Sequence, residues 1–173
     1  MIKMTNEKIK TISELKDISE ELRNQNKIVI TTNGVFDILH IGHIRYLQEA
    51  KKLGDVLIVA VNSDFSTKRI KGPKRPLNNE KDRVEALAAL ECVDYVAIFN
   101  EENPIKFLEE IKPGIHAKGG DYNINQIIEK DAVEKNNGKI VLIPKVKGYS
   151  TSDLINKIIK VYTTRGFLKT THK

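Results

Sequence analysis

The chain has 173 residues, of which 40% are hydrophobic and 30% charged, a size and composition typical of one globular domain rather than two. Its 29 Lys and Arg residues outnumber its 23 Asp and Glu residues and give a net charge of +6. This excess favours anionic ligands, such as nucleic acids, phosphate esters or nucleotides, without choosing between them.

The sequence offers no segment suited to export or to a membrane. Its longest apolar run, residues 56–61, is far shorter than the roughly 20 residues that span a bilayer. The first ten residues are too polar for a signal peptide. The single cysteine, Cys92, excludes an internal disulfide and a cysteine-based zinc cluster, and its apolar surroundings favour a buried structural role. We therefore expect a cytoplasmic protein with no membrane partner.

In chain order, helical and strand patterns alternate. The first helix is predicted at about residues 11–25, where Thr11 and Glu14 form a capping box. Residues 63–77 are predicted to form a long loop, since they combine five basic residues with Gly and Pro. Strands are predicted at residues 27–32, 56–62, 95–99, 115–118 and 139–143, and further helices after residue 34 and near residues 79, 103, 125 and 151.

This βαβ series predicts an α/β fold, a Rossmann-like, doubly wound parallel sheet of five strands with helices on both faces. Because no repeat or linker is visible, one domain is expected over residues 1–173, with the first helix, a core at 27–162 and a flexible basic tail at 163–173. In such a sheet the ligand lies at the carboxyl ends of the strands. The last helix is expected to face the core with Leu154, Ile155, Ile158 and Ile159.

The most informative motif, residues 31–43, follows the first predicted strand and reads TTNGVFDILHIGH. His40 and His43 are three apart, so at a helix start they point to one place, where the helix N-terminus favours an anion. Gly34 permits a tight turn, and Gly42 lets another group approach the backbone. Imidazole N–H donors there can stabilise charge on a phosphate, so a phosphate-binding or catalytic role is favoured. Zinc is rejected because the sequence has no Cys or third His nearby.

Two motifs in the middle of the chain lie at the same predicted sheet edge. Asp64, after the second strand, suits either hydrogen bonds from sugar hydroxyls or capping of a turn. The basic residues 68–75 suit closure over phosphates better than a merely solvated charge run. Arg83 stands near a helix start, where the dipole disfavours a cation, which indicates a specific partner.

Two later motifs have equally balanced interpretations. Residues 118–122, KGGDY, could lie against a flat ligand or form an ordinary turn. Residues 148–152, GYSTS, could bind a second phosphate at a helix start or simply cap that helix.

Together these segments resemble the nucleotidyltransferase superfamily marked by His-x-Gly-His, and within it the adenylyltransferases of ADP-heptose synthesis. The resemblance extends over residues 27–159, nearly the whole chain. The matching segments are residues 33–43, 62–64, 71–73, 75–78, 82–83, 118–122 and 148–151, in the same order.

The resemblance implies direct in-line transfer of AMP from ATP to a heptose 1-phosphate, with Mg²⁺ and release of pyrophosphate, for lipopolysaccharide or other surface glycans. It also implies a homodimer. In related proteins this activity is often fused to a sugar kinase, which this sequence does not contain, so the resemblance implies a separate kinase in the same pathway. His40 and His43 would stabilise the α-phosphate, and Lys71 would clamp the phosphates. Asp37, like Asp64, would bind the sugar phosphate. The implied nucleotide-binding residues are Asn33, Gly34, Phe36, Gly42, Arg83, Lys118, Gly119, Gly120, Asp121, Ser150 and Thr151.

Two alternatives stay open. Lys145 and Lys147 stand near the place where related cytidylyltransferases have a triphosphate-binding arginine, which leaves CTP and a glycerol 3-phosphate-type acceptor as a rival. A non-catalytic nucleotide- or RNA-binding module is the second. Such modules usually bind through aromatic stacking or a known nucleic-acid-binding motif. Because only 6% of the residues are aromatic and no such motif is visible, we expect no nucleic-acid partner.

Overall fold

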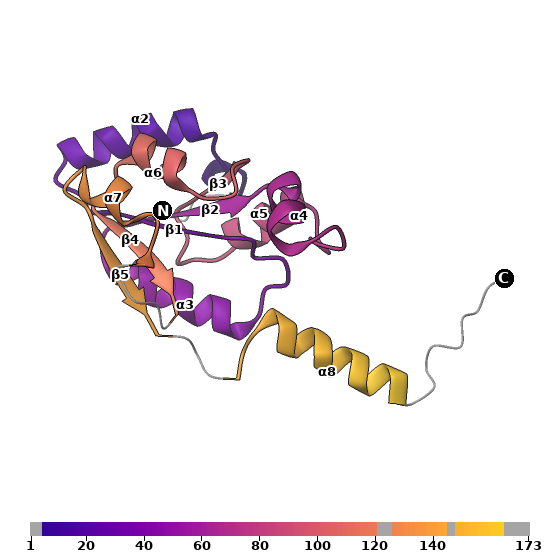
Figure 1. The fold of residues 1–173 in the computed structure, drawn as a ribbon. Coiled ribbons are helices and arrows are strands. Elements are labelled where there is room, and N and C mark those ends of the chain that lie inside the picture. The colour runs from indigo at the N-terminus through magenta and orange to yellow at the C-terminus, as the bar shows by residue number, and fades with distance from the viewer. Residues whose placement is uncertain (1–4, 121–125, 145–147, 165–173) are drawn as a thin grey trace.

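The computed structural model describes residues 5–120, 126–144 and 148–164. In these residues a five-stranded parallel sheet has the order β3-β2-β1-β4-β5 (Figure 1). The chain runs outward from β1 to β3 and then crosses back to β4 and β5, so the order reverses between β1 and β4. This confirms the predicted doubly wound fold. The strands are β1 (Val29–Gly34), β2 (Val56–Asn62), β3 (Tyr95–Phe99), β4 (Ile115–Gly119) and β5 (Lys139–Ile143).

Helices cover both faces of the sheet (Figure 1). In β2, Leu57 and Val59 face one layer while Ile58 and Ala60 face the other, and all four are fully buried. Double coverage explains why this strand is continuously apolar. One layer contains α3 (Ile41–Lys51) and α5 (Glu80–Ala88), and the other α2 (Ile12–Asn24), α6 (Ile105–Ile111) and α7 (Lys130–Glu134).

The first predicted helix is confirmed as α2, which follows the short α1 (Thr5–Lys8). The Thr11 hydroxyl accepts from the Glu14 N–H, and the Glu14 carboxylate accepts from the Thr11 N–H at 2.8 Å. This is the predicted capping box. Leu15 is fully buried on the sheet, with the other apolar residues of the stripe partly buried around it.

The prediction of a loop at residues 63–77 was wrong in its first half, which forms α4 (Asp64–Lys71). The Ser63 hydroxyl caps this helix by accepting from the Ser66 N–H, and Gly72 ends it at a φ of 92°. The basic residues in the last turn suit the negative end of the helix dipole. The positive charges and the glycine that suggested a loop are therefore signals of a helix C-terminus.

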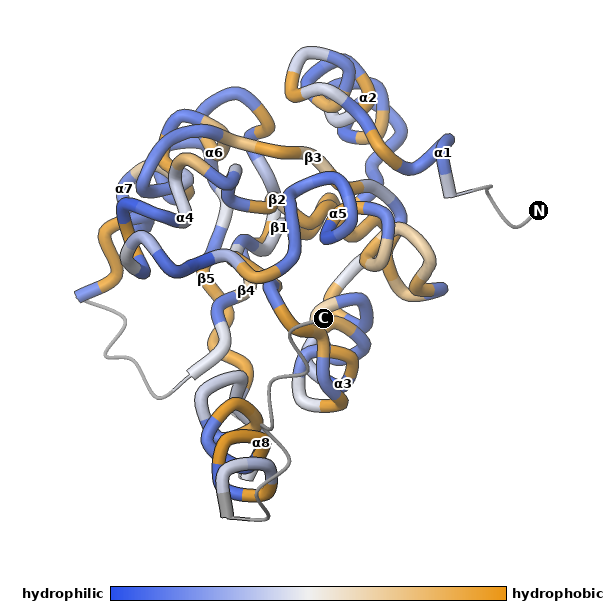
Figure 2. The backbone as a smooth tube through the Cα atoms, turned by 90° about the vertical axis from the view of Figure 1, so that its right-hand side faces the viewer, coloured by the Kyte–Doolittle hydropathy of each residue, from blue (hydrophilic) through white to orange (hydrophobic). Residues whose placement is uncertain are grey.

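The expectation that the last helix packs on the core was also wrong. The helix α8 (Thr151–Thr164) extends away from the body, with apolar turns along its length (Figures 1 and 2). Ile158 and Ile159 are 46% and 53% exposed, and Leu154 and Ile155 are half-buried. Helical periodicity identifies an apolar stripe, but it does not say what covers that stripe.

Other boundaries differ slightly from the predictions. The helix expected from residue 125 begins at Lys130 as α7, and β4 reaches Gly119. The helix α8 continues to Thr164, past the predicted start of a tail at residue 163. Within the described ranges, every helix is too short or too polar to span a bilayer.

Candidate active site

Two cavities open beside each other at the carboxyl ends of the strands, where the fold predicts a ligand. The histidine cavity, about 450 Å³, is lined by His40, Tyr46, Gly119 and Ser150, among others. The charged cavity, about 470 Å³, is lined by three cations and three carboxylates. Seven residues line both cavities and so form a common wall: Asn33, Gly34, Val35, Phe36, His43, Lys71 and Thr151.

The two histidines of the motif converge as predicted. His40 is the N-cap of α3 and His43 lies in its first turn, and their rings stack with centroids 3.9 Å apart and planes 21° from parallel. The Phe36 ring meets His43 edge-on at 5.4 Å. His43 therefore stands on the common wall, at the positive end of the helix dipole.

Both histidines lose affinity for a proton in this setting. Burial, together with the neighbouring His40, lowers the pKa of His43 to about 4, against a smaller opposite effect of the Ile38 backbone. Burial also lowers the pKa of His40 below its ordinary value. At neutral pH the pair therefore presents uncharged imidazoles, whose N–H groups can donate to a phosphate.

Gly42 allows the segment that leads into α8 to approach α3 closely. A Cβ at Gly42 would lie 2.9 Å from the His40 ring and 2.9 Å from the Tyr149 Cβ, so a larger residue would displace one of them. The Ser150 hydroxyl caps α8 by accepting from the Asp153 N–H at 3.0 Å. The structural interpretation of this serine is thus confirmed, while the start of α8 also borders the histidine cavity.

Tyr46 is a site residue that sequence reasoning missed. Its hydroxyl lies 2.6 Å from the Thr32 hydroxyl and donates to the Ala117 carbonyl at 2.9 Å. The ring lines the histidine cavity beside Gly119, whose added Cβ would lie 3.1 Å from it. Burial raises the pKa of Tyr46 to about 12. Its place one turn after His43 on the same helix face was the available signal.

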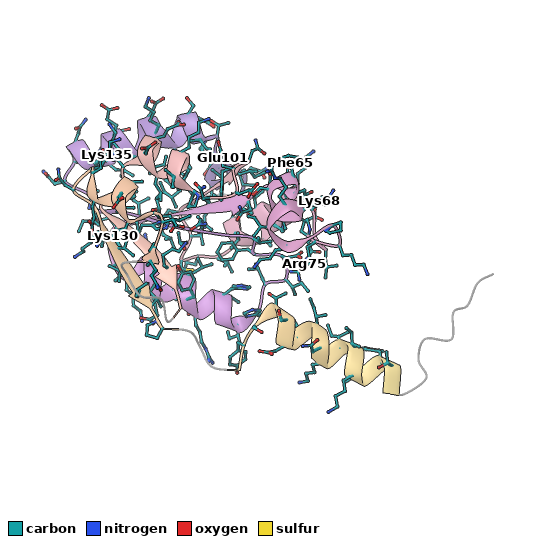
Figure 3. All side chains as sticks on the ribbon, viewed as in Figure 1. Phe65, Lys68, Arg75, Glu101, Lys130 and Lys135 are labelled. Carbon is teal, nitrogen blue, oxygen red and sulfur yellow. The ribbon has the colours of Figure 1, made fainter. Side chains whose placement is uncertain are left out.

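The carboxylate of Asp37 binds the segment after α4. It accepts from the backbone N–H groups of Leu77 at 2.8 Å and Asn78 at 2.9 Å, and from Arg75, the residue of this segment that is labelled in Figure 3. Burial raises its pKa, but these donors outweigh that effect, so the pKa of Asp37 lies below its ordinary value. Although it lines the charged cavity, only 1% of its side chain is exposed. Its geometry favours a positioning role over the predicted contact with the sugar phosphate.

Asp64 and Arg83 bind each other and line neither main cavity. The Arg83 guanidinium, 1% exposed, donates to Asp64 at 2.9 Å and to the carbonyl of Asn62 at 2.7 Å. It also donates to the carbonyls of Val35 and Asn78. The expected partner of Arg83 exists, but it is the protein itself, so the positions of these two residues do not support the predicted ligand contacts.

Lys118 and Glu129 form an ion pair in the wall of the charged cavity. The Lys118 Nζ lies 2.6 Å from a Glu129 oxygen and 3.4 Å from the Asn33 Oδ1. Glu129 is another residue that sequence reasoning missed, because its place beside Lys118 depends on the fold. Gly120 donates to the Ile143 carbonyl and lines neither main cavity, and Asp121 lies outside the described residues.

Lys71 differs from the other cations of the charged cavity. Arg75 pairs with Asp37, and Lys118 with Glu129. Lys71, at the end of α4, makes no ion pair within the described part of the chain. It lines both cavities, so its ammonium group is available to a ligand in either.

A doubly wound parallel sheet with a histidine-bearing helix start and two cavities at its switch point defines a nucleotide-binding α/β protein. Residues 31–157 match the family model described as cytidylyltransferase-like. The chain belongs to this family.

Similar proteins and structures agree with this assignment. The chain is 46% identical to the bifunctional protein HldE of Geobacter metallireducens over 90% of its own length, and 47% identical to that of Nitratiruptor sp. over 89%. It spans about a third of the length of these relatives, 32% in both cases.

Two solved structures share the fold. The lipopolysaccharide core biosynthesis protein of Thermoplasma volcanium is 35% identical, with a TM-score of 0.59 over 72% of this chain and 99% of that one. The pantoate-beta-alanine ligase of Francisella tularensis is 20% identical, with a TM-score of 0.56 over 94% of this chain and 81% of its own, and supports the fold alone.

Proposed function

We propose that the protein is a nucleotidyltransferase that transfers AMP from ATP to a heptose 1-phosphate and releases pyrophosphate. The observation that carries the proposal is the common wall, where His43 and Lys71 face two adjacent cavities at once. A group-transfer enzyme needs this arrangement because its two substrates must meet at one phosphorus atom. The similarity to HldE and to a lipopolysaccharide core biosynthesis protein supports the heptose acceptor.

The histidine cavity suits the triphosphate. Of the described residues that line it, none is Asp or Glu, so no carboxylate opposes a polyanion there. The start of α8 at Ser150 and Thr151 and the start of α3 both direct helix N-termini toward it. Gly119 and Tyr46 are placed to border the base.

The charged cavity then holds the acceptor. An oxygen of the acceptor phosphate attacks the α-phosphorus of ATP and forms the new P–O bond. The bond from that phosphorus to the α–β bridging oxygen breaks, and pyrophosphate leaves with the bonding electrons. His40 and His43 donate to the α-phosphate oxygens as charge shifts there, and Lys71 neutralises charge on the phosphates.

Mg²⁺ is proposed as the companion of ATP. Among the described residues, no three His, Cys, Asp or Glu side chains lie close enough to hold a metal ion by themselves. Mg²⁺ often binds through substrate phosphates and water with little help from protein, so the residues fit an ion that arrives with the nucleotide. The homodimer, the separate sugar kinase and the cytoplasmic location stay predictions.

The test is pyrophosphate release from a matrix of nucleotides and acceptors. ATP and CTP are each combined with heptose 1-phosphate, hexose 1-phosphates and glycerol 3-phosphate. We expect release with ATP and heptose 1-phosphate to exceed every other pair. Release only with CTP and glycerol 3-phosphate would favour the cytidylyltransferase alternative, and RNA binding with no release from any pair would favour the binding module.

A further inference from the structure

The charged cavity contains more negative charge than a simple phosphate site requires. Its cations are Lys71, Arg75 and Lys118, but Asp37, Glu102 and Glu129 also line it. A carboxylate weakens the attraction of a nearby cation for phosphate. Phosphate binding therefore does not explain why three acids line this cavity, and at least one of them needs another role.

Of the three acids, Glu129 is the one suited to contact a ligand. Asp37 already accepts from three groups of the 75–78 segment. Glu102 pairs with Arg69 and its side chain is 52% exposed. Glu129 is only 5% exposed, although it has a single donor, Lys118, within the described part of the chain. A carboxylate has about four acceptor positions, and the donors among the described residues occupy only part of this capacity.

The position of Glu129 also indicates that its side chain does not serve to cap its own helix. It stands at the N-cap of α7, yet its side chain makes no capping hydrogen bond there. It reaches instead to Lys118 at the end of β4, 2.6 Å away. A nearly buried ion pair gains little stability, because desolvation of both charges offsets their attraction.

The pair places a cation, the kind of group that can bind a phosphate, directly beside a carboxylate, which can accept from a hydroxyl. A sugar 1-phosphate has the same arrangement, with a phosphate on C1 and a hydroxyl on the adjacent carbon C2. Lys118 also lies 3.4 Å from Asn33 on the common wall, so a phosphate at Lys118 lies on the side nearest the nucleotide.

We infer that Glu129 is a specificity-determining residue that accepts a hydrogen bond from the hydroxyl next to the acceptor's phosphate, while Lys118 binds that phosphate. The inference rests on the proposed function and identifies the substrate class of the charged cavity as a phosphate ester with a neighbouring hydroxyl. Glu129 thus separates sugar phosphates from phosphate alone.

The decisive variant is Glu129→Gln, which keeps the size of the side chain and removes its charge. We expect its KM for heptose 1-phosphate to rise about tenfold, since the hydrogen bond to a charged carboxylate becomes a weaker one to a neutral amide, with the KM for ATP unchanged. With 2-deoxyheptose 1-phosphate, kcat/KM of the unmodified protein should fall about tenfold, and that of the variant should fall less than threefold.

A second measurement should show a change in the opposite direction, namely tighter binding of a ligand to the variant. Inorganic phosphate, tested as a competitive inhibitor against the acceptor, should bind several-fold more tightly to Glu129→Gln, because Lys118 loses its neutralising partner. General damage to the fold would weaken both ligands. Glu134→Gln, an exposed residue at the end of the same helix, is the matched control and should change neither constant.

The outcomes separate the inference from the function on which it rests. If the unmodified protein releases no pyrophosphate from ATP and heptose 1-phosphate, both are overturned. If it does, but Glu129→Gln keeps the acceptor KM and the full discrimination against the 2-deoxy compound, the inference alone is overturned. Weaker binding of inorganic phosphate to this variant would also overturn it.

Discussion

The histidine cavity and the charged cavity differ in how their polar groups are held. Within the described residues, the first contains no carboxylate and two histidines with lowered pKa values. In the second, Arg75 and Lys118 are already paired with carboxylates of the same wall. Lys71 belongs to both cavities and is not paired within this part of the chain.

This difference indicates a division of roles between the two cavities. Unpaired donors have their strongest interaction with a ligand whose charge changes during the reaction, as at the α-phosphate of a nucleotide. Paired charges are fixed in place by each other and suit recognition of a ligand that combines charge with hydroxyl groups. The following variants test this division, beginning with the largest expected effect.

The change His43→Ala should reduce kcat by about a hundredfold to a thousandfold, the usual cost of removing one donor to a developing charge. The KM for ATP should change far less, because other groups of the histidine cavity still bind the triphosphate. The measurement is steady-state pyrophosphate release, with the melting transition recorded alongside. Gln48→Ala, an exposed change on the same helix, is the control. Turnover close to that of the control would contradict the role of the histidine cavity in the chemical step.

The change Lys71→Met should reduce kcat/KM by about tenfold to a hundredfold for both substrates, because this cation faces both cavities. Lys68→Met, on the same helix but on neither cavity wall, should behave as the unmodified protein. Kinetics measured with each substrate varied in turn provide the test. An effect confined to one substrate would contradict a role for Lys71 in binding both.

Much of the fold was predictable because its determinants are local. The capping box at Thr11 and the apolar run of β2 identified their elements correctly, since each pattern depends on neighbours in the sequence. The helices α4 and α8 show the limit of this reasoning. A basic helix end resembles a charged loop, and an exposed apolar stripe has the same period as a buried one.

Prediction of the site residues from the sequence was limited in the same way, because it succeeded only where the determinants are local. His40 and His43 were predictable because three residues of helix bring them together. Most partners of Asp37 and Arg83 come from segments some 20 to 50 residues away, so a motif match could not separate a ligand contact from an internal one. The hydrogen bond from Tyr46 to the Ala117 carbonyl forms only because β4 lies next to β1, and Glu129 gains its place only where α7 meets Lys118 of β4.

The change Asp37→Asn should affect stability more than chemistry. It places an amide opposite backbone N–H groups and removes the partner of Arg75, which should lower the free energy of unfolding by about 1–3 kcal/mol. We expect kcat/KM for the acceptor to fall by less than tenfold, since the group positions a cavity wall. Urea denaturation and kinetics at one temperature measure both effects, with Asp17→Asn, exposed on α2, as the control. A loss of turnover as large as that of His43→Ala, without loss of stability, would instead indicate direct contact with substrate.

The smallest expected effect is a difference in how the two cavities respond to acid. The pKa of His43 is about 4 in the folded protein against an ordinary 6.5, so between these values the unfolded chain binds more protons and stability falls as the pH falls. The lowered pKa of Asp37 contributes stability that is lost only as the pH falls below its ordinary 3.8. From pH 6.5 to 4, His43 of the histidine cavity therefore costs stability as the pH falls, while Asp37 does not. In urea denaturation, His43→Gln should match the unmodified protein at pH 8 and lose less stability by pH 4.5. An equal loss in both proteins would show that His43 is not the group that resists protonation.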